Sequence, residues 1–513
     1  MDVLDLGRWQ FGITTVYHFI FVPLTIGLAP LVAGLQTAWV RTGDEKWLKL
    51  TKFFGKLLLI NFAIGVVTGI VQEFQFGMNW SEYSRFVGDV FGAPLAMEAL
   101  AAFFVESTFL GLWIFGWGRL PKKIHLACIW AVALATNLSA YFILAANSWM
   151  QHPVGSIFNE ETGRAELVDI WAVLTNNTVL AAFPHTITAA FVTAGTFVAG
   201  ISAWWMVRLV RSKKAENITL AKTVYRSGLR LGMWVMLVAG VGVAFTGHWQ
   251  AQLMFDQQPA KMAAAEGLCH SEKGADFSIL TIGNLNGDCA SVKHIIALPN
   301  LTSFLATNTF DAEIKGTIQI QDEMAQKFGA TRGEHSTIVG VDAPTDGTAD
   351  QELSYIPNLA VTYWSFRLMI GFGVFSAALA LAGLWVTRKG GVTDSKWIKR
   401  LALVAIPAPF LASAFGWIFT EMGRQPWVVY PNPNPSGVDG VWMMTWRGVS
   451  NGVGPGTVIT SLVAFTLVYG ALAVVWGKLM HRYAIEGVPT EVHDESPEAN
   501  PDKDEDAPLS FAY

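Results

Sequence analysis

Apolar residues fall into long runs along this chain, and polar residues collect between them. A run of about 17 residues or more with few charges can span a lipid bilayer as a helix. Nine such runs are present, so the pattern predicts an all-α polytopic membrane protein of about nine transmembrane helices. They cover approximately Thr14–Val40, Phe53–Gln72, Ala93–Trp117, Ile124–Trp149, Val179–Val210, Leu231–Gly247, Asn358–Val386, Trp397–Thr420 and Val458–Met480.

The composition points the same way. Of 513 residues, 52% are hydrophobic and only 15% are charged, and the mean hydropathy is positive. These values exceed what the core of a soluble protein requires. The stretch before the first run lacks a basic region and a small-residue cleavage site, so we expect the first run to remain in the mature protein. We expect no nucleic-acid partner.

Lys and Arg are concentrated in alternate loops, and cytoplasmic loops are the ones that hold such an excess. The other short loops hold single positive residues such as Arg85 and Arg164. This bias predicts that the N-terminus lies outside and the C-terminus lies in the cytoplasm. The basic loops follow the first, third, fifth and seventh runs, with Arg41, Lys46 and Lys49; Arg119, Lys122 and Lys123; Arg208, Arg211, Lys213, Lys214 and Lys222; and Arg388, Lys389, Lys396, Lys399 and Arg400.

One long hydrophilic segment, residues 249–356, interrupts the runs, and the predicted topology places it on the outer face. Segments of this length without regular structure are usually functional or disordered. Cys269 and Cys289 lie in it, in a compartment that permits disulfides, so we predict a bridge between them; two free thiols are the alternative. We expect helices 1–6 in residues 1–248, helices 7–9 in residues 357–482 and a disordered acidic cytoplasmic tail in residues 483–513.

The segment GWIFTEMGRQPW, residues 416–427, carries the carboxylate of Glu421 to the end of an apolar run. An ionisable group in the hydrocarbon region costs roughly 2.5–3.5 kcal/mol, so such a group is a functional candidate. Arg424 can balance its charge. The alternative is an ordinary helix end at the membrane interface, where Gly423 and Pro426 stop the helix.

Other polar groups lie within the runs, and the alternating topology brings them to the outer half of the membrane or close to it. Imidazole and thioether are the usual axial ligands of a low-spin haem iron, and a nearby Arg can neutralise a haem propionate. No CxxCH motif is present, so any haem is bound non-covalently. The groups are His18, Glu98, Glu106, His185, Arg367 and Met369.

Two other functions use the same residues. A buried His or Met taken singly is more often an ordinary core residue. A proton-coupled transporter could use the ionisable groups as a relay, but it would leave Met369 without a role, and the internal repeats that it predicts are not visible. A haem-bearing electron-transfer subunit without oxygen chemistry would need only His185 and Met369.

Four motifs together resemble subunit I of the cytochrome bd quinol oxidases, from the first run to the ninth. They are GRQPW at 423–427, EFQFGMNW at 73–80, GAPLAMEALAAFFVEST at 92–108 and FRLM at 366–369. The resemblance implies one low-spin haem b, one high-spin haem b and one haem d. It also implies that the enzyme oxidises menaquinol or ubiquinol at the outer face and reduces O2 to water with protons from the cytoplasm, which generates a proton-motive force.

The resemblance further implies a heterodimer with subunit II in the lipid of the bacterial cytoplasmic membrane, which small accessory subunits can join. The hydrophilic segment resembles the quinol-binding region and lacks a long C-terminal insertion, which indicates the short quinol-loop subtype. Its stretch QQPAKMAAAE holds Lys261 and Glu266, which are five positions apart and could face one pocket. A carboxylate there can accept a proton from quinol. Without the resemblance, both would be ordinary charges on an exposed helix.

The resemblance also implies roles for single residues. His185 and Met369 match the ligands of the low-spin haem b, with Arg367 in support. Glu421 matches the ligand of the high-spin haem b and His18 is assigned to haem d, although the division of these two haems among His18, Glu98 and Glu421 stays open. Trp417 resembles an aromatic residue between the haems, and ordinary packing is an equal alternative.

A second set of residues is a candidate proton path. Glu106 lies about 12 Å deeper than Glu98 at 1.5 Å per residue, so the two can be successive stations; the alternative is that Glu106 only bonds a neighbouring helix. Ser139 and His125 match positions linked to proton uptake. Lys52, Lys56 and Asn61 are candidates for proton entry, or the lysines only snorkel.

Overall fold

The computed structural model describes residues 2–283, 285, 291–341, 347–432 and 440–491. These residues contain nine segments long and apolar enough to cross a membrane, which confirms the predicted number, and the fold is all-helical apart from short two-stranded sheets. The single-helix spans are α1 (Val3–Thr42), α2 (Glu45–Met78), α5 (Lys122–Gln151), α14 (Leu359–Val386) and α17 (Pro455–Glu486). The composite spans are α3 (Ser81–Met97) with η1 (Glu98–Phe103) and α4 (Phe104–Phe115); α6 (Ile170–Leu174) with α7 (Asn177–Arg211); α8 (Ala215–Leu220) with η2 (Ala221–Tyr225) and α9 (Arg226–Gln257); and α15 (Lys396–Ala405) with α16 (Pro407–Arg424).

Short polar side chains set where several of these helices begin. The first backbone N–H groups of a helix have no partner within it, and Asp or Asn at the N-cap can accept from them. Asp2, Asp44, Asn176 and Asn358 accept in this way at the starts of α1, α2, α7 and α14. Gly43 ends α1 with a φ of 69°, a conformation that glycine adopts without steric cost.

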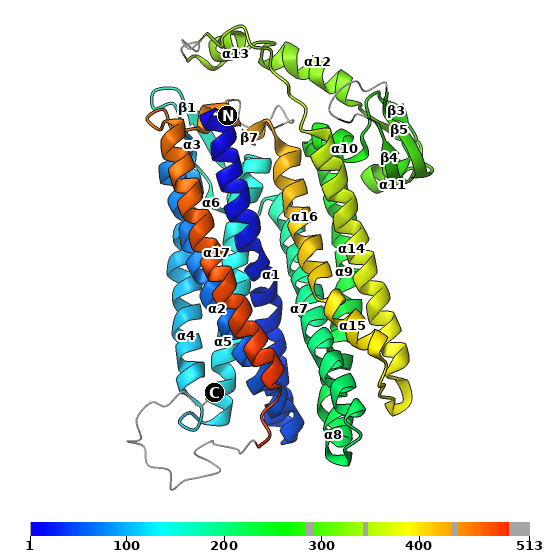
Figure 1. The fold of residues 1–513 in the computed structure, drawn as a ribbon. Coiled ribbons are helices and arrows are strands. Elements are labelled where there is room, and N and C mark those ends of the chain that lie inside the picture. The colour runs from blue at the N-terminus through cyan, green and yellow to red at the C-terminus, as the bar shows by residue number, and fades with distance from the viewer. Residues whose placement is uncertain (1, 284, 286–290, 342–346, 433–439, 492–513) are drawn as a thin grey trace.

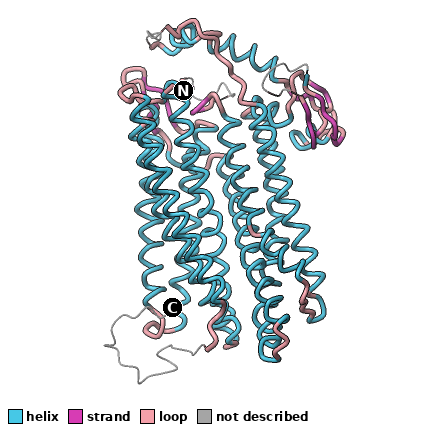
Figure 2. The backbone as a smooth tube through the Cα atoms, viewed as in Figure 1, coloured by secondary structure: helices cyan, strands magenta, loops and turns pink. Residues whose placement is uncertain are grey.

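The helices form one bundle with two distinct ends (Figure 1). The N-terminal end of α1 and the described part of residues 258–358 lie at the same end, here called the loop end, while α17 finishes at the opposite end. On one side of the bundle α1 packs against α2, α5 and α17; on the other α7 packs against α9, and α14 packs against α16. The tube in Figure 2 shows that the strands of the described residues lie at the loop end.

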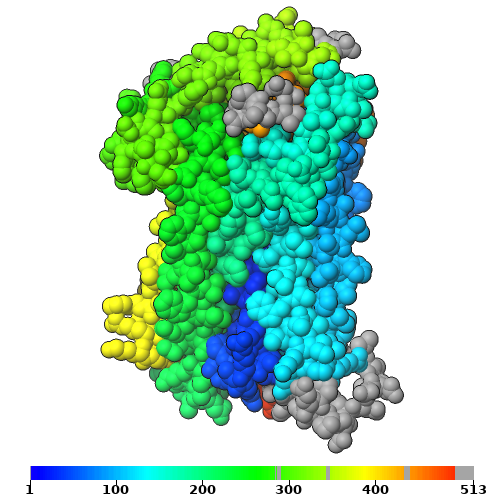
Figure 3. All heavy atoms as spheres, turned by 180° about the vertical axis from the view of Figure 1, so that it is seen from behind, coloured from blue at the N-terminus to red at the C-terminus, as the bar shows by residue number. Residues whose placement is uncertain are grey.

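The hydrophilic segment is folded rather than extended. The α9 helix continues to Gln257, beyond the predicted boundary at 248. A layer of short elements follows and covers the loop end (Figure 3). It comprises α10 (Pro259–Glu266), β3 (Glu272–Lys273), β4 (Phe277–Ile282), β5 (Lys293–Leu298), α11 (Leu301–Thr307), β6 (Glu313–Ile314), α12 (Thr317–Phe328) and α13 (Arg332–Val339). Two further hairpins at this end pair β1 (Ser156–Asn159) with β2 (Arg164–Leu167) and β7 (Trp427–Val429) with β8 (Met443–Met444).

Cys269 is disulfide-bonded, whereas Cys128 is a free, buried thiol. The predicted partner Cys289 lies outside the described residues. The α17 helix continues to Glu486, past the predicted start of the tail at 483, and the rest of that predicted tail is described only as far as Glu491.

Two irregularities were not expected from the hydrophobic pattern. Residues Glu98–Phe103 form a π-helical segment one turn after Pro94, which lacks an N–H for the helix ladder. Such segments are frequent at functional sites. The eighth span breaks at Ile406 before Pro407, so that α16 is a separate helix that carries Glu421 towards the loop end.

Candidate functional site

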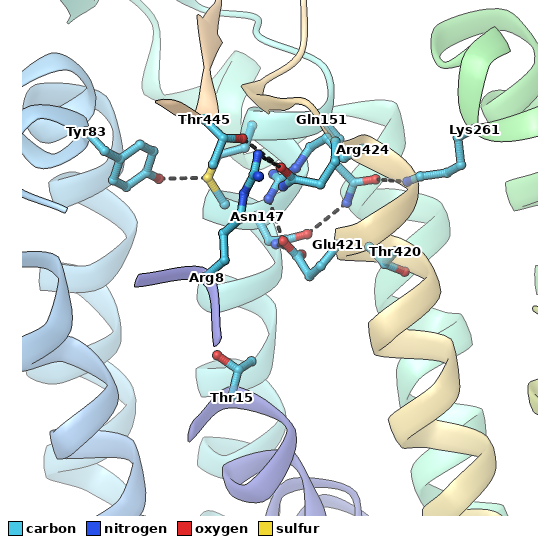
Figure 4. Close-up of polar contacts among 12 residues, drawn as sticks. Arg8, Thr15, Tyr83, Asn147, Gln151, Lys261, Thr420, Glu421, Arg424 and Thr445 are labelled. Atoms are coloured by element: carbon cyan, nitrogen blue, oxygen red, sulfur yellow. Dashed lines mark hydrogen bonds and ion pairs between the residues drawn. The ribbon is translucent and has the colours of Figure 1, made fainter. Parts of the chain in front are cut away.

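Glu421 lies in the last turn of α16, where it is held from two sides (Figure 4). Its Oε1 accepts from Nδ2 of Asn147 at 2.8 Å, and its Oε2 lies 2.5 Å from Nη2 of Arg424. The side chain of Arg424 is 4% exposed and that of Glu421 is 22% exposed. The helix does end here, as the alternative interpretation had it, but the end is buried and carries an ion pair. Nε and Nη1 of Arg424 remain buried without a partner among the described residues.

The amide of Asn147 is one link in a longer polar chain that leads to the loop end. Nε2 of Gln151 donates to Oδ1 of Asn147 at 2.8 Å, and Nζ of Lys261 donates to Oε1 of Gln151 at 3.2 Å. Figure 4 shows this chain running from Lys261 on α10 to Glu421 on α16. The pKa of Lys261 is lowered to about 7, mainly by burial and in part by the Arg424 charge, while Glu421 opposes the shift.

Glu266, at the other end of α10, pairs with a different helix. Its Oε2 lies 2.5 Å from Nη2 of Arg367 on α14, and it also accepts from the backbone N–H of Ser278 at 3.2 Å. Arg367 donates from Nη1 to the carbonyl of Ala265 at 2.8 Å. Burial raises the pKa of Glu266, and the Arg367 guanidinium opposes that rise.

Lys261 and Glu266 therefore contact different partners, and a pocket shared by the two remains a prediction. Five residues along an α-helix turn the side chain by about 500°, which leaves the two directions about 140° apart. Lys261 reaches the Glu421 cluster while Glu266 reaches Arg367. Both are buried, at 4% and 3% exposed, so they are not surface charges either.

The predicted low-spin haem ligands lie on neighbouring helices. His185, on α7, has its Nδ1 3.0 Å from Oγ1 of Thr246 on α9. Met369 lies on α14, which packs against both α7 and α9. Gly416 on α16 faces its thioether, since a Cβ at that position would lie 2.9 Å from Sδ of Met369. A larger residue at this position would therefore displace the Met369 thioether.

His18 lies on α1 and contacts α2. Its Nδ1 is 2.9 Å from Oγ1 of Thr68. The next residue of α1, Phe19, stacks on Trp417 with ring centroids 5.0 Å apart. Trp417 thus packs between α1 and α16, and its buried Nε1 has no partner among the described residues. The Trp417 ring thus makes ordinary packing contacts, and its Nε1–H could donate a hydrogen bond to a bound group.

The carboxylates of the third span lie at and below the π-helical segment. Oγ of Ser139 donates to Oε1 of Glu98 at 2.7 Å, so α5 and η1 are joined at the first of them. Glu106 is only 6% exposed. No hydrogen bond joins Glu106 to a neighbouring helix within the described part of the chain, so the structural alternative for Glu106 receives no support.

Farther towards the opposite end, His125 is fully partnered. Its Nδ1 accepts from Nε2 of Gln36 at 2.8 Å, and its Nε2 donates to the carbonyl of Trp113 at 2.8 Å. Asn61 bonds Phe21 and Thr25 of α1 and so joins α1 to α2. Lys56 pairs with Glu486 at 3.7 Å, and Lys52 lies over the ring of Trp117.

Sequence reasoning missed Gln151 and Asn147, although they connect the two ends of the site. A signal was present, since the amides stand in the stretch AANSWMQ at the loop end of an apolar run. Buried amides at membrane depth need hydrogen-bond partners, which makes them candidates for a network.

The whole chain is similar to known proteins. It matches the family described as cytochrome bd terminal oxidase subunit I over residues 6–488. The chain belongs to this family. It is 43% identical to cytochrome bd ubiquinol oxidase subunit 1 of Bacillus subtilis (strain 168) over 499 residues, which cover 97% of this chain and 97% of the relative.

Two further proteins support membership in the cytochrome bd family. Cytochrome bd-II ubiquinol oxidase subunit 1 of Escherichia coli (strain K12) is 35% identical over 531 aligned positions, which cover 97% of this chain and 99% of the relative. The structure of bd oxidase from Geobacillus thermodenitrificans has a TM-score of 0.77 at 25% identity and covers 94% of this chain and 99% of that chain. The chain is thus a membrane subunit of a respiratory quinol:O2 oxidoreductase, and its family implies haem cofactors.

The residues fit haem as that family requires. The described residues contain no group of three or more His, Cys, Asp or Glu side chains able to hold a bare metal ion. Instead they offer single axial donors, His18, His185, Met369 and Glu421, from four helices. The two unpartnered nitrogens of Arg424 are suited to a propionate. The donor set therefore matches iron that is already held in a tetrapyrrole.

Proposed function

We propose that this chain oxidises quinol at the loop end and carries the site of O2 reduction to water, as the haem-bearing subunit of a cytochrome bd oxidase. The observation that carries the proposal is the ion pair between Glu266 and Arg367, at 2.5 Å. It joins the loop helix α10 to the helix that holds Met369. A base for quinol is thereby fixed beside the helix of a haem ligand.

His185 and Met369 would hold the low-spin haem b, Glu421 the high-spin haem b and His18 haem d, with Arg367, Arg424, Trp417 and Glu98 around them. When bound, these haems supply the one-electron carriers and the iron at which O2 is reduced. Arg424 is placed to neutralise a propionate, because two of its buried nitrogens are free. Arg367 is committed to Glu266 and to two backbone carbonyls, so its supporting role would act through the position of α14.

Quinol gives up two protons with its two electrons, and the chain offers two separate bases. Glu266 can accept one proton because burial favours its neutral form. Lys261 can accept a proton because its pKa lies at about 7, where the neutral amine is populated. Since these side chains point in different directions, they serve different steps or different protons.

Protons for O2 reduction would enter from the opposite end. Glu106 and Glu98 are in order along the third span, and Ser139 holds Glu98 by a hydrogen bond of 2.7 Å. His125 has both ring nitrogens engaged, so it would pass a proton only after a bond breaks. Lys52 and Lys56 lie near the end of this route.

We place the loop end on the outer face of a bacterial cytoplasmic membrane, because the basic loops lie at the opposite end. Proton uptake at the cytoplasmic end and proton release at the outer face would generate a proton-motive force. The third, seventh and ninth spans are the least buried, at 17%, 11% and 11%, which supports lipid and a second membrane subunit as neighbours, and accessory subunits can join them. The short-loop subtype and the use of menaquinol or ubiquinol belong to this proposal.

A reduced-minus-oxidised visible spectrum of the solubilised protein with its co-purified partner, repeated with carbon monoxide, tests the function. A far-red chlorin band that shifts with carbon monoxide is the expected result. If only low-spin haem b bands appear, the chain would be an electron-transfer subunit without a site for O2 reduction. Absence of every haem would refute the proposed role as the haem-bearing subunit.

A further inference from the structure

The two histidines proposed as haem ligands are held by the same arrangement on different helix pairs. Nδ1 of His18 on α1 is 2.9 Å from Oγ1 of Thr68 on α2. Nδ1 of His185 on α7 is 3.0 Å from Oγ1 of Thr246 on α9. In each case a ring nitrogen from one helix meets a threonine hydroxyl on the helix that packs against it.

The hydroxyl of each threonine already has an acceptor in its own helix. Oγ1 of Thr68 donates to the carbonyls of Ile64 and Gly65, both at 3.0 Å. Oγ1 of Thr246 donates to the carbonyl of Gly242 at 2.8 Å and also lies 3.3 Å from that of Val243. A hydroxyl carries one hydrogen and can accept at its lone pairs. With its hydrogen directed to the backbone, each threonine accepts from the histidine.

The tautomer follows from that direction. A neutral imidazole carries one hydrogen, so a histidine that donates from Nδ1 presents a bare lone pair at Nε2. The side-chain hydrogen bonds of His18 and His185 within the described ranges are both made by Nδ1, and the His185 ring also bonds to the backbone of Val243, one turn before Thr246. His125 shows the opposite case, since its Nε2 donates to the carbonyl of Trp113 and is not available to a metal.

A glycine follows each threonine and contacts the same ring. A Cβ at Gly69 would lie 3.2 Å from Cε1 of His18, which is closer than ordinary contact, and one at Gly247 would lie 3.4 Å from Cε1 of His185. The sequence repeats the arrangement as TGIVQ at 68–72 and TGHWQ at 246–250. In both sites the threonine contacts Nδ1 of the imidazole, and the glycine leaves room for Cε1 of the same ring to lie close to the helix.

We infer that Thr68 and Thr246 are positioning residues that fix His18 and His185 as Nδ1–H tautomers, so that each presents Nε2 to a haem iron. The inference rests on the proposed function, because it takes both histidines as ligands. An acceptor at the distal nitrogen makes a histidine a stronger donor to the metal. Each threonine therefore sets the affinity and the reduction potential of one haem.

The test compares Thr68→Val and Thr246→Val with Thr68→Ser and Thr246→Ser in the complete oxidase. Valine keeps the shape and removes the acceptor, whereas serine keeps the hydroxyl. The readouts are haem content by difference spectrum and the midpoint potential of each haem by spectroelectrochemical titration. We expect each valine variant to retain its own haem roughly 10–100-fold less tightly, or to raise the potential of that haem alone. The serine variants should restore both values, and the haem served by the other threonine is the internal folding control.

Thr51→Val and Thr196→Val are matched controls. Both threonines are buried in spans and donate only to a carbonyl of their own helix, that of Trp47 or Val192. They should leave all haem bands and potentials unchanged. The inference would be overturned if Thr68→Val and Thr246→Val kept normal haem content and midpoint potentials while His18→Ala and His185→Ala lost haem. In that case the proposed ligand assignment would still stand. Retention of every haem in the alanine variants would instead refute the ligand assignment, and the inference with it.

Discussion

Nη2 of Arg367 lies 2.5 Å from Oε2 of Glu266, and the two side chains are only 7% and 4% exposed. The contact joins the transmembrane helix of Met369 to the first helix of the loop layer. A buried pair of this kind contributes little net stability, but removal of one partner leaves an uncompensated charge. The pair therefore fixes the loop to the membrane part at the place where quinol chemistry is proposed.

Replacement of Glu266 by Gln should slow quinol oxidation and destabilise the protein, because the Arg367 charge would remain buried without its partner. Breaking a buried pair costs about 3–5 kcal/mol. Steady-state oxidation of a soluble quinol and thermal unfolding measure the two effects. Glu272→Gln, at an exposed site on β3, is the control and should change neither. Wild-type rates in Glu266→Gln would exclude Glu266 as the base.

The pH dependence of quinol oxidation should reflect Lys261, whose pKa is lowered to about 7. Above that pH the neutral amine can accept a proton, so kcat/KM should rise as the pH increases through about 7. The unfolded chain keeps this proton up to the ordinary value of 10.5. It thus binds more protons than the folded protein between those values, and the Lys261 contribution to stability rises with pH there.

The variant Lys261→Met should lose this titration from the pH profile. Lys273→Met, which changes an exposed lysine on the same layer, should keep it. If Lys261→Met retains the wild-type profile, another group is responsible for it.

Replacement of Glu421 by Ala should remove the high-spin haem b while the low-spin haem remains. The carboxylate is the proposed iron ligand, and its loss also frees Asn147 and Arg424. Haem difference spectra measure this. Glu82→Ala removes another Glu–Arg ion pair at the same i,i+3 spacing, with Arg85 on α3, and should leave all bands intact. Unchanged haem content in Glu421→Ala would refute the assignment.

Ser139→Ala should slow O2 reduction while haem content stays normal. Ser139 holds Glu98 by a hydrogen bond of 2.7 Å, and a typical hydrogen bond contributes about 0.5–1.5 kcal/mol. The oxygen consumption rate and its solvent isotope effect measure proton delivery. Ser202→Ala changes a buried serine on α7 whose hydroxyl has no partner in the described structure, and it should be neutral. Equal rates in both variants would argue against a proton path at Ser139.

The nine spans could be predicted from the sequence because burial in lipid needs only a long apolar run, which is a local property. The ends of spans were less predictable. The α9 helix continues past the predicted boundary to Gln257, and the eighth span divides before Pro407. The π-helical segment Glu98–Phe103 could not be predicted from hydrophobicity either, because its residues are as apolar as those of an ordinary α-helical span.

The candidate site residues could be named from motifs, but their partners could not. Lys261 and Glu266 are close in sequence and yet belong to different clusters, because helical rotation separates them. Gln151 and Thr68 resemble ordinary polar residues of a span until a neighbouring helix brings Lys261 or His18 to them.

The sequence by itself determined the membrane class, the number of spans and, through GRQPW and FRLM, the family-specific residues, since these depend on composition and on short segments of chain. Only the tertiary structure decided which charges are paired and that Nδ1 of His18 and of His185 meets a threonine hydroxyl. Hydrogen bonds act over about 3 Å. Their partners here come from helices far apart in sequence, and the packing of those helices alone brings the atoms into range.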